Sequence, residues 1–366
     1  MKIAIIGTRG IPNNYGGFEQ FAEFLSVGLV ERGHSVYVYN SHNHNYKYSE
    51  WKGVHIIHKY DPEFMIGTAG QFIYDLNCII DSRKRGFDVL LNLGYTSSSV
   101  WSRFFPKNAV LITNMDGLEW KRTKYSERVR KFLVYAEKLA VKRSDLLVAD
   151  SKAIKWYLKE KYGVESHFIA YGATVFNEPD PKTLTNYQLE PYNYHLLIAR
   201  IEPENNIETI LDGYNMSAVK KNILVVGNQK NTFGQYLVNK YCDNKQIIFT
   251  GTIYDHKTIN NLRHFSDLYF HGHSVGGTNP SLLESMACGC MIVAHNNEFN
   301  KAVLDNDALF FNSSDEVRAI LGKTDENFRK TCIPNNYEKI TSLYSWPLII
   351  NSYEKLMSLS LMGAEK

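Results

Sequence analysis

Short apolar runs alternate along the chain with longer segments in which apolar residues recur every three or four positions. The first run, residues 2–7, is rich in β-branched side chains and predicts a buried parallel strand. A loop with three glycines follows at 8–17, and an apolar stripe with helical spacing then continues to Gly33. With the next strand-like run, 35–39, this pattern predicts a right-handed βαβ unit.

The same alternation predicts an α/β fold in two successive doubly wound units, whose strand ends would border a ligand cleft. The first would occupy residues 1–175 and the second 190–345, joined through a linker within 173–193 that is rich in Pro, Asn and Thr. Further strands are predicted at 53–58, 87–93, 109–113, 145–149, 166–169, 195–199, 223–227, 246–251, 267–271 and 291–294. Helices are predicted in the second unit at 206–218, 255–264 and 280–288.

Charge and composition narrow the function classes. The 366 residues carry a net charge of +3, which does not indicate a nucleic-acid partner. Residues 1–172 hold 24 Lys+Arg against 17 Asp+Glu, so this half is the one expected to meet an acidic partner such as a lipid surface. We expect a cytoplasmic protein, because no apolar run is long enough for a membrane span and no signal-peptide pattern opens the chain.

The cysteine and histidine patterns do not favour a metal. Five scattered cysteines without a CxxC motif fit reduced structural thiols. The pairs His42/His44 and His271/His273 have no cluster of further ligands beside them in the sequence, so we expect structural histidines and no metal site.

Two segments of the first half suggest ligand contacts. The loop with Gly10, Gly16 and Gly17 would let backbone N–H groups approach a phosphate or a sugar, unless it is only a tight structural turn. It is not G-x-G-x-x-G, and no acidic residue ends the second strand, so NAD binding is disfavoured. Asp116 should lie at a strand end on the cleft side. The basic stretch 121–143, with Trp120 before it, fits an anionic lipid surface or a solvated helix face.

Two segments of the second half suggest an anion site. Arg200 at a strand end suits a diphosphate, because its guanidinium can bind two oxygens. Asn279 and Pro280 predict a helix start, and the glycines before them leave it open to an anion. Glu284 lies one turn into that helix, where its carboxylate could accept from both hydroxyls of a ribose.

Over nearly its whole length the chain resembles retaining GT-B glycosyltransferases of the family 4 type. The resemblance lies in Gly16, Gly17 and Glu19, in the Arg200 segment, and in Glu284 with the ACGCMIV run that follows its helix. It implies two Rossmann-like domains facing a central cleft, and a C-terminal helix, 346–366, that crosses back to the first domain. The segments DGLEWKR, EPENN and HGHSVGGTNPS are more narrowly similar to a bacterial subgroup associated with rhamnosyl transfer in capsule and other surface polysaccharides.

The chain departs from the family pattern at three positions. Gly276 replaces the first Glu of the usual E-x7-E pair, Asn205 replaces the diphosphate Lys, and Asp116 replaces the usual His. These changes indicate either a donor of different shape, such as a 6-deoxy sugar on dTDP, or an impaired site. The matching subgroup segments favour the first, with dTDP-rhamnose as donor.

The resemblance then implies a set of site residues. Asp116, Arg200 and Glu284 would act in catalysis. Donor binding would fall to Gly16, Gly17, Arg200, Asn205, Gly276, Gly277, Thr278, Asn279 and Glu284. The acceptor side would hold Asn14, Tyr15, Glu19, Asp116 and Glu119. No cofactor or metal would be required. The acceptor would be a lipid-diphosphate-linked glycan, reached by peripheral contact of the basic first domain with the inner face of the cell membrane.

Two alternatives remain. A nucleotide-sugar epimerase or dehydrogenase would need NAD, and NAD binding is disfavoured because no acidic residue ends the second strand. A non-catalytic GT-B-like partner subunit of a polysaccharide-synthesis complex would explain Gly276, Asn205 and Asp116 as losses. A turnover assay separates that subunit from an enzyme.

Overall fold

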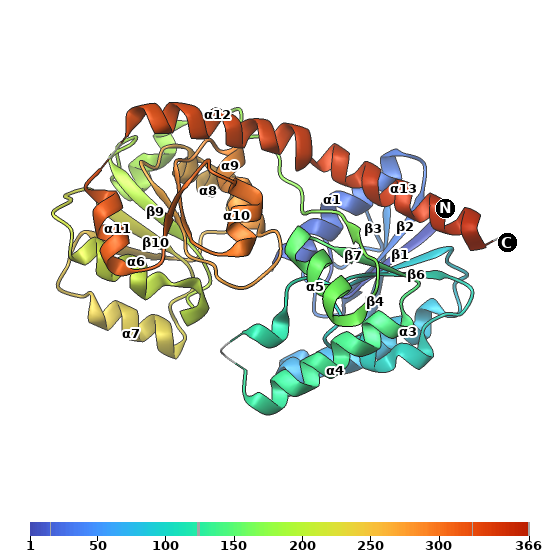
Figure 1. The fold of residues 1–366 in the computed structure, drawn as a ribbon. Coiled ribbons are helices and arrows are strands. Elements are labelled where there is room, and N and C mark those ends of the chain that lie inside the picture. Colours follow the sequence, from blue (N-terminus) through green and yellow to red (C-terminus); the bar gives the residue numbers. More distant parts are fainter. Residues whose placement is uncertain (15, 123–124, 324, 365–366) are drawn as a thin grey trace. The chain divides into compact units, whose positions relative to one another are not determined.

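Two compact α/β units make up the protein in a computed structural model that describes residues 1–14, 16–122, 125–323 and 325–364 (Figure 1). One unit comprises Met1–Tyr171 together with Trp346–Lys366, and the other comprises Gly172–Ser345. Each is built on a largely parallel sheet with helices on its faces, so the expected pair of Rossmann-like domains is confirmed.

The first unit contains a sheet of eight strands in the order β3-β4-β2-β1-β5-β6-β7-β8. The strands are β1 (Lys2–Ile6), β2 (Ser35–Ser41), β3 (Glu50–Trp51), β4 (Val54–Lys59), β5 (Val89–Leu93), β6 (Val110–Asn114), β7 (Leu146–Ala149) and β8 (His167–Phe168). The helices are α1 (Gly17–Glu31), α2 (Glu63–Ile66), η1 (Gly67–Ala69), α3 (Gly70–Ser82), η2 (Ser99–Phe104), η3 (Glu119–Lys121), α4 (Glu127–Arg143), α5 (Lys152–Tyr162) and α13 (Trp346–Ala364).

The second unit contains a sheet of six strands in the order β11-β10-β9-β12-β13-β14. The strands are β9 (Tyr194–Ile198), β10 (Asn222–Val226), β11 (Ile247–Gly251), β12 (Tyr269–His271), β13 (Ile292–His295) and β14 (Leu309–Phe311). The helices are η4 (Pro181–Tyr187), η5 (Pro203–Asn205), α6 (Ile207–Asn215), α7 (Thr232–Lys240), α8 (His256–His264), α9 (Pro280–Ala287), α10 (Glu298–Leu304), α11 (Ser314–Leu321) and α12 (Glu326–Leu343).

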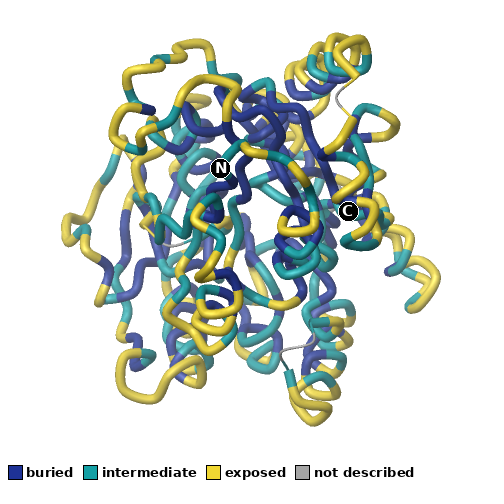
Figure 2. Tube along the Cα trace, turned by 90° about the vertical axis from the view of Figure 1, so that its left-hand side faces the viewer, coloured by how far each residue is buried: buried dark blue, intermediate teal, exposed yellow. Residues whose placement is uncertain are grey.

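The β-branched runs predicted as strands form the interior of both units. The residues of β1, β5 and β13 are almost entirely buried, and buried segments gather in the interior of the molecule (Figure 2). Burial on both faces explains why these runs are continuously apolar rather than alternating.

The C-terminal helix α13 docks on α1 within the first unit. Trp346 stacks on Phe24 with ring centroids 4.5 Å apart, and Tyr353 meets Phe21 edge-on at 5.3 Å. Gly28 permits this approach, because a Cβ there would lie 2.3 Å from the Cδ1 atom of Ile350. The terminal helix is therefore an integral part of the first unit.

Candidate functional site

The strand order of the second unit places two predicted motifs beside each other. β9 and β12 are neighbours in the sheet although β10 and β11 lie between them in the sequence, so the direction of winding changes between them. Ligands of doubly wound sheets bind outside the carboxyl ends of the strands at such a point. The loops that leave these two ends carry Arg200 and the 272–279 segment.

These two loops hold each other in place. Asn206 donates from Nδ2 to the carbonyl of Gly272 at 2.8 Å, and Ser274 donates from Oγ to the carbonyl of Glu204 at 2.7 Å. Gly272 is needed here, because a Cβ would lie 2.0 Å from the carbonyl oxygen of Asn205. The carboxyl edge of the sheet is thus a preorganised frame.

Arg200 and Asn205 take different places in this frame. Arg200 is exposed, whereas Asn205 is 5% exposed and donates from Nδ2 to the carbonyl of Arg200 at 2.7 Å. Asn205 therefore shapes the loop that presents Arg200. Asn205 was predicted to bind the donor, and in the structure its amide nitrogen is hydrogen-bonded to a backbone carbonyl.

The start of α9 matches its sequence pattern. Asn279 is the N-cap and accepts from the Ser281 N–H at 2.9 Å, with Pro280 in the first turn. Before it, Gly276 has a φ of +145°, a conformation that L side chains rarely adopt, and Thr278 is 4% exposed. Gly276 and Gly277 are half-buried. Backbone N–H groups at this helix end form the anion-favouring part of the edge.

Glu284 has a partner that the sequence did not indicate. Its Oε2 lies 2.6 Å from Nη2 of Arg263, in the last turn of α8, whose side chain is only 3% exposed. Arg263 also donates to Ser281 Oγ at 3.2 Å and to Asn260 Oδ1 at 3.0 Å. Burial opposes the charge of Arg263, but the attraction of Glu284 raises the pKa of the guanidinium above its usual value. The Glu284 side chain, 21% exposed, is held by this pair.

The two histidines of the HGH segment lie against each other at the carboxyl end of β12. His271 is fully buried and stacks on His273 at 4.4 Å, and burial lowers the pKa of His271 well below its ordinary value. The carbonyl of His273 accepts from Nδ2 of Asn297 and of Asn300, at 2.9 and 3.0 Å. Within the described part of the chain, no three potential metal ligands gather at one place.

In the first unit the loop after β1 is braced from inside by Glu19. Its Oε1 accepts from Thr8 Oγ1 at 3.1 Å and from the Arg9 N–H at 2.9 Å, and Glu19 is 4% exposed. Gly16 precedes α1 as its N-cap, and Gly17 and Asn14 are exposed. Tyr15, expected on the acceptor side, lies outside the described residues. Glu19 therefore fixes the loop and does not face solvent as an acceptor contact.

Asp116 follows β6, as expected, and its backbone is strained. Its φ is +52°, which is unusual for a residue other than glycine and is typical of functional sites. The Asp116 N–H donates to Asn114 Oδ1 at 3.0 Å, and Asn114 in turn donates to the hydroxyl of Tyr353 at 3.0 Å. Glu119 pairs with Arg122 at 2.7 Å. Asp116 belongs to the first unit, whereas Arg200 and Glu284 belong to the second.

The loop after Asp116 is anchored by Glu137, which the sequence reasoning missed. This carboxylate in α4 is 1% exposed, and its donors come from the loops after β5 and β6 and from α5. They are Tyr95 (3.5 Å), Trp120 (3.1 Å), Tyr157 (2.7 Å), Lys161 (2.9 Å) and Tyr162 (2.6 Å). A single Glu in a basic stretch gives no signal of this role, because its donors are up to 42 positions away.

Two family models match the chain, each over less than half of its length. Residues 1–174 match a domain of unknown function, DUF1972, and residues 185–338 match the glycosyl transferases group 1. An uncharacterized glycosyltransferase of Methanocaldococcus jannaschii is 28% identical over 240 residues, which cover 60% of this chain and 59% of that relative. The match thus spans less than two thirds of the relative's length.

Solved structures share the complete fold. Sucrose-phosphate synthase from Thermosynechococcus elongatus has a TM-score of 0.81 at 17% identity, with 99% of each chain covered. HepE of Anabaena, in complex with UDP-glucose, has a TM-score of 0.77 at 14% identity, covering 97% of this chain and 99% of HepE. The fold is therefore GT-B. Together with the match of residues 185–338, it supports a glycosyltransferase of group 1.

Proposed function

We propose that this protein transfers a sugar from a nucleotide diphosphate sugar to an acceptor hydroxyl. The observation that carries the proposal is the braced pair of loops at the β9–β12 edge, one of which carries exposed Arg200 while the other leads into the N-terminus of α9. Both features favour an anion, and a nucleoside diphosphate is the anion that must be stabilised as it leaves the sugar.

In this proposal the residues of the second unit bind the donor. Arg200 and the N–H groups at the start of α9 hold the diphosphate, and Glu284, oriented by Arg263, accepts from the ribose hydroxyls. Asp116 orients the acceptor or takes part in moving its proton. The anomeric configuration is retained, and the diphosphate charge is met by these residues without a metal.

We propose dTDP-rhamnose as the donor. Gly276 places no carboxylate where the family pattern has one, and this leaves room beside a 6-deoxy sugar. The test is turnover with dTDP-rhamnose, UDP-glucose and GDP-mannose, with and without EDTA, and with NMR of the product anomer. Transfer from UDP-glucose alone would support a glycosyltransferase but contradict rhamnose as the donor sugar. Loss of activity in EDTA would contradict a mechanism without a metal.

Arg200→Ala is the variant that tests the donor site. Arg200 is exposed, so its removal leaves the fold intact, and Arg318→Ala on α11 is the matched control. We expect nucleotide affinity to fall about tenfold or more in Arg200→Ala only. The Asn205 amide nitrogen is bonded to a backbone carbonyl, which also fits a second candidate function, that of a non-catalytic sugar-binding partner subunit. Nucleotide binding without turnover on any donor would favour that subunit.

We propose a lipid-linked acceptor at an anionic membrane surface. On α2, Phe64, Met65 and Ile66 are 66%, 66% and 50% exposed, and on basic α4, Phe132 and Tyr135 are 36% and 57% exposed. Phe132 of α4 meets Phe72 of α3 at 5.7 Å, so α4 packs beside α3, the helix that follows α2 and η1 in the chain. No helix in the described residues is long and apolar enough to cross a membrane.

Vesicle co-sedimentation tests this surface. We expect binding to vesicles containing phosphatidylglycerol but not to phosphatidylcholine alone, with a loss at high salt. Phe64→Ser with Met65→Ser should weaken binding, whereas Leu359→Ser, 56% exposed on α13, should not. Equal binding by both variants would refute the assignment.

A further inference from the structure

A cavity of about 860 Å³ lies in the second unit at the edge of the sheet opposite the donor loops. Part of its lining lies at the amino ends of strands, with Tyr192 before β9, Lys221 before β10 and Asp267 before β12, and much of the rest belongs to α12. β9 has five residues and therefore spans about 16 Å, which separates this edge from Arg200. The volume is in the range that holds a small organic ligand.

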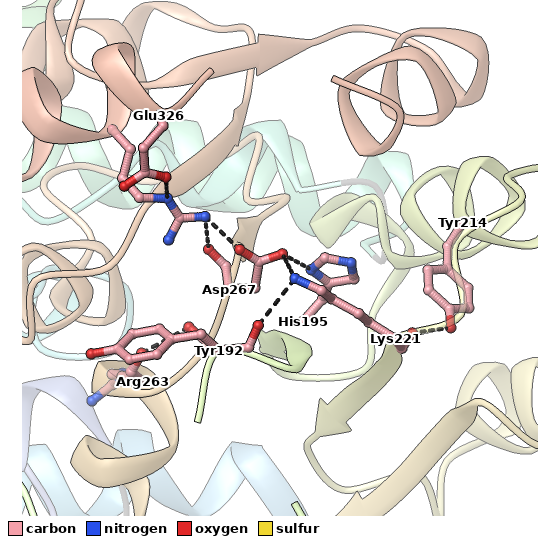
Figure 3. A network of polar contacts seen from close by, with 9 residues as sticks. Tyr192, His195, Tyr214, Lys221, Arg263, Asp267 and Glu326 are labelled. Carbon is pink, nitrogen blue, oxygen red and sulfur yellow. Dashed lines mark hydrogen bonds and ion pairs between the residues drawn. The ribbon is translucent and has the colours of Figure 1, made fainter. Parts of the chain in front are cut away.

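Asp267, which lines the cavity, is the centre of a network of polar contacts, called the floor below (Figure 3). Lys221 Nζ lies 2.7 Å from Oδ2 of Asp267, and Arg329 Nη2 lies 2.5 Å from Oδ1. Lys221 also donates to the Tyr192 carbonyl at 3.0 Å. Two cations fixed on one carboxylate leave the floor rigid and net positive.

The rim adds charge of the same sign. Lys330 on α12 is exposed and has no ion pair within the described residues. Glu326 approaches Arg329 only at 3.8 Å, and its side chain is 67% exposed, so water screens it. The occupant should therefore carry a negative charge.

Aromatic side chains form part of the cavity lining. Tyr192 and Tyr337 are 50% and 37% exposed, and the hydroxyl of Tyr337 is fixed to Asn177 Oδ1 at 3.0 Å. Phe176 meets His264 at an interplanar angle of 66°, and Tyr192 meets Phe265 at 69°. An aromatic ring face beside a hydroxyl suits the C–H face of a sugar.

We propose that this cavity binds an anionic sugar, with the ring on Tyr337 and the carboxylate or phosphate toward Lys330 and the cationic floor. Such a ligand would be either an acidic residue of a glycan or a free sugar phosphate. The site is separate from the donor edge, yet Cys288 at the end of α9 lines it. Neither the proposed donor nor the proposed acceptor is needed for this binding.

Isothermal titration of the full chain with glucuronate, glucose 1-phosphate and glucose tests the proposal. We expect both anionic sugars to bind at least about tenfold more tightly than glucose. Lys330→Glu should abolish that preference, and Tyr337→Ala should weaken all three sugars. Lys257→Glu on α8, an exposed charge reversal outside the lining, should change nothing.

The outcomes separate this site from the donor site. Binding must survive Arg200→Ala, which removes the donor-edge cation. Preference for glucuronate identifies a glycan residue, and preference for glucose 1-phosphate identifies a free sugar phosphate. The proposal is overturned by equal affinity for glucose, by no binding at millimolar concentration, by dependence on Arg200, or by tighter Lys330-dependent binding of UMP.

Discussion

Removing the carboxylate of Glu284 should destabilise the second unit, besides any effect on a nucleotide. Arg263 is 3% exposed and would remain as a buried guanidinium without its anion. Breaking one partner of a buried pair costs about 3–5 kcal/mol. Glu284 is 21% exposed, so water can enter in its place, and we expect the lower end, about 3 kcal/mol, for Glu284→Ala. At about 2–4 °C per kcal/mol, the melting temperature would fall by about 6–12 °C.

Urea denaturation and calorimetry of Glu284→Ala, Arg263→Met and the double variant measure this coupling. We expect the double variant to be more stable than Glu284→Ala, because no buried charge is left unpaired. Glu338→Ala on α12, an exposed Glu in the same unit, is the control. A loss below about 0.5 kcal/mol in Glu284→Ala, equal to that of the control, would refute the reasoning.

The outcome also decides how donor binding can be probed. If the pair carries stability, then lost nucleotide binding in Glu284→Ala reports a damaged fold as well as a lost contact. Glu284→Gln keeps the volume and one oxygen, so we expect it to be destabilised less while still weakening ribose binding.

Three further predictions concern other buried groups. Glu137→Gln keeps a hydrogen-bond acceptor for Trp120 but loses the negative charge that faces Lys161. We expect a higher KM for the acceptor substrate and an unchanged KM for the donor. An equal rise in both KM values would contradict the positioning role of Glu137. Burial lowers the pKa of His195 to about 4, below the value of 6.5 in the unfolded chain. Up to about 3 kcal/mol of the stability present above pH 6.5 should therefore be lost as the pH falls toward 4. In urea denaturation, His195→Asn should flatten the dependence of stability on pH in this range, and an unchanged slope would contradict this. Burial raises the pKa of Asp75 to about 7, although the hydrogen bond from Ser97 acts in the opposite direction. The wild type should therefore lose up to about 4 kcal/mol of stability as the pH rises from 4 to 7. At pH 8 Asp75→Asn should be the more stable protein, and equal stabilities there would refute this prediction.

The sequence by itself determined the repeating architecture and the positions of the main motifs. Continuous β-branched runs must be buried on both faces, and this places helices around them whatever the rest of the chain does. The Asn279–Pro280 helix start was readable for the same reason, since capping is settled between neighbours in the chain. The short edge strands β3 and β14 were not predicted.

Only the tertiary structure decided which partners the polar residues of these motifs have within the protein. Asn205, Glu19 and Glu284 looked alike as site residues, yet Asn205 holds a carbonyl, Glu19 holds its own loop and Glu284 is paired with Arg263. Glu137 and Arg263 gave no signal at all. A buried polar group must find partners, and those partners come from distant segments that meet only when the sheet is formed.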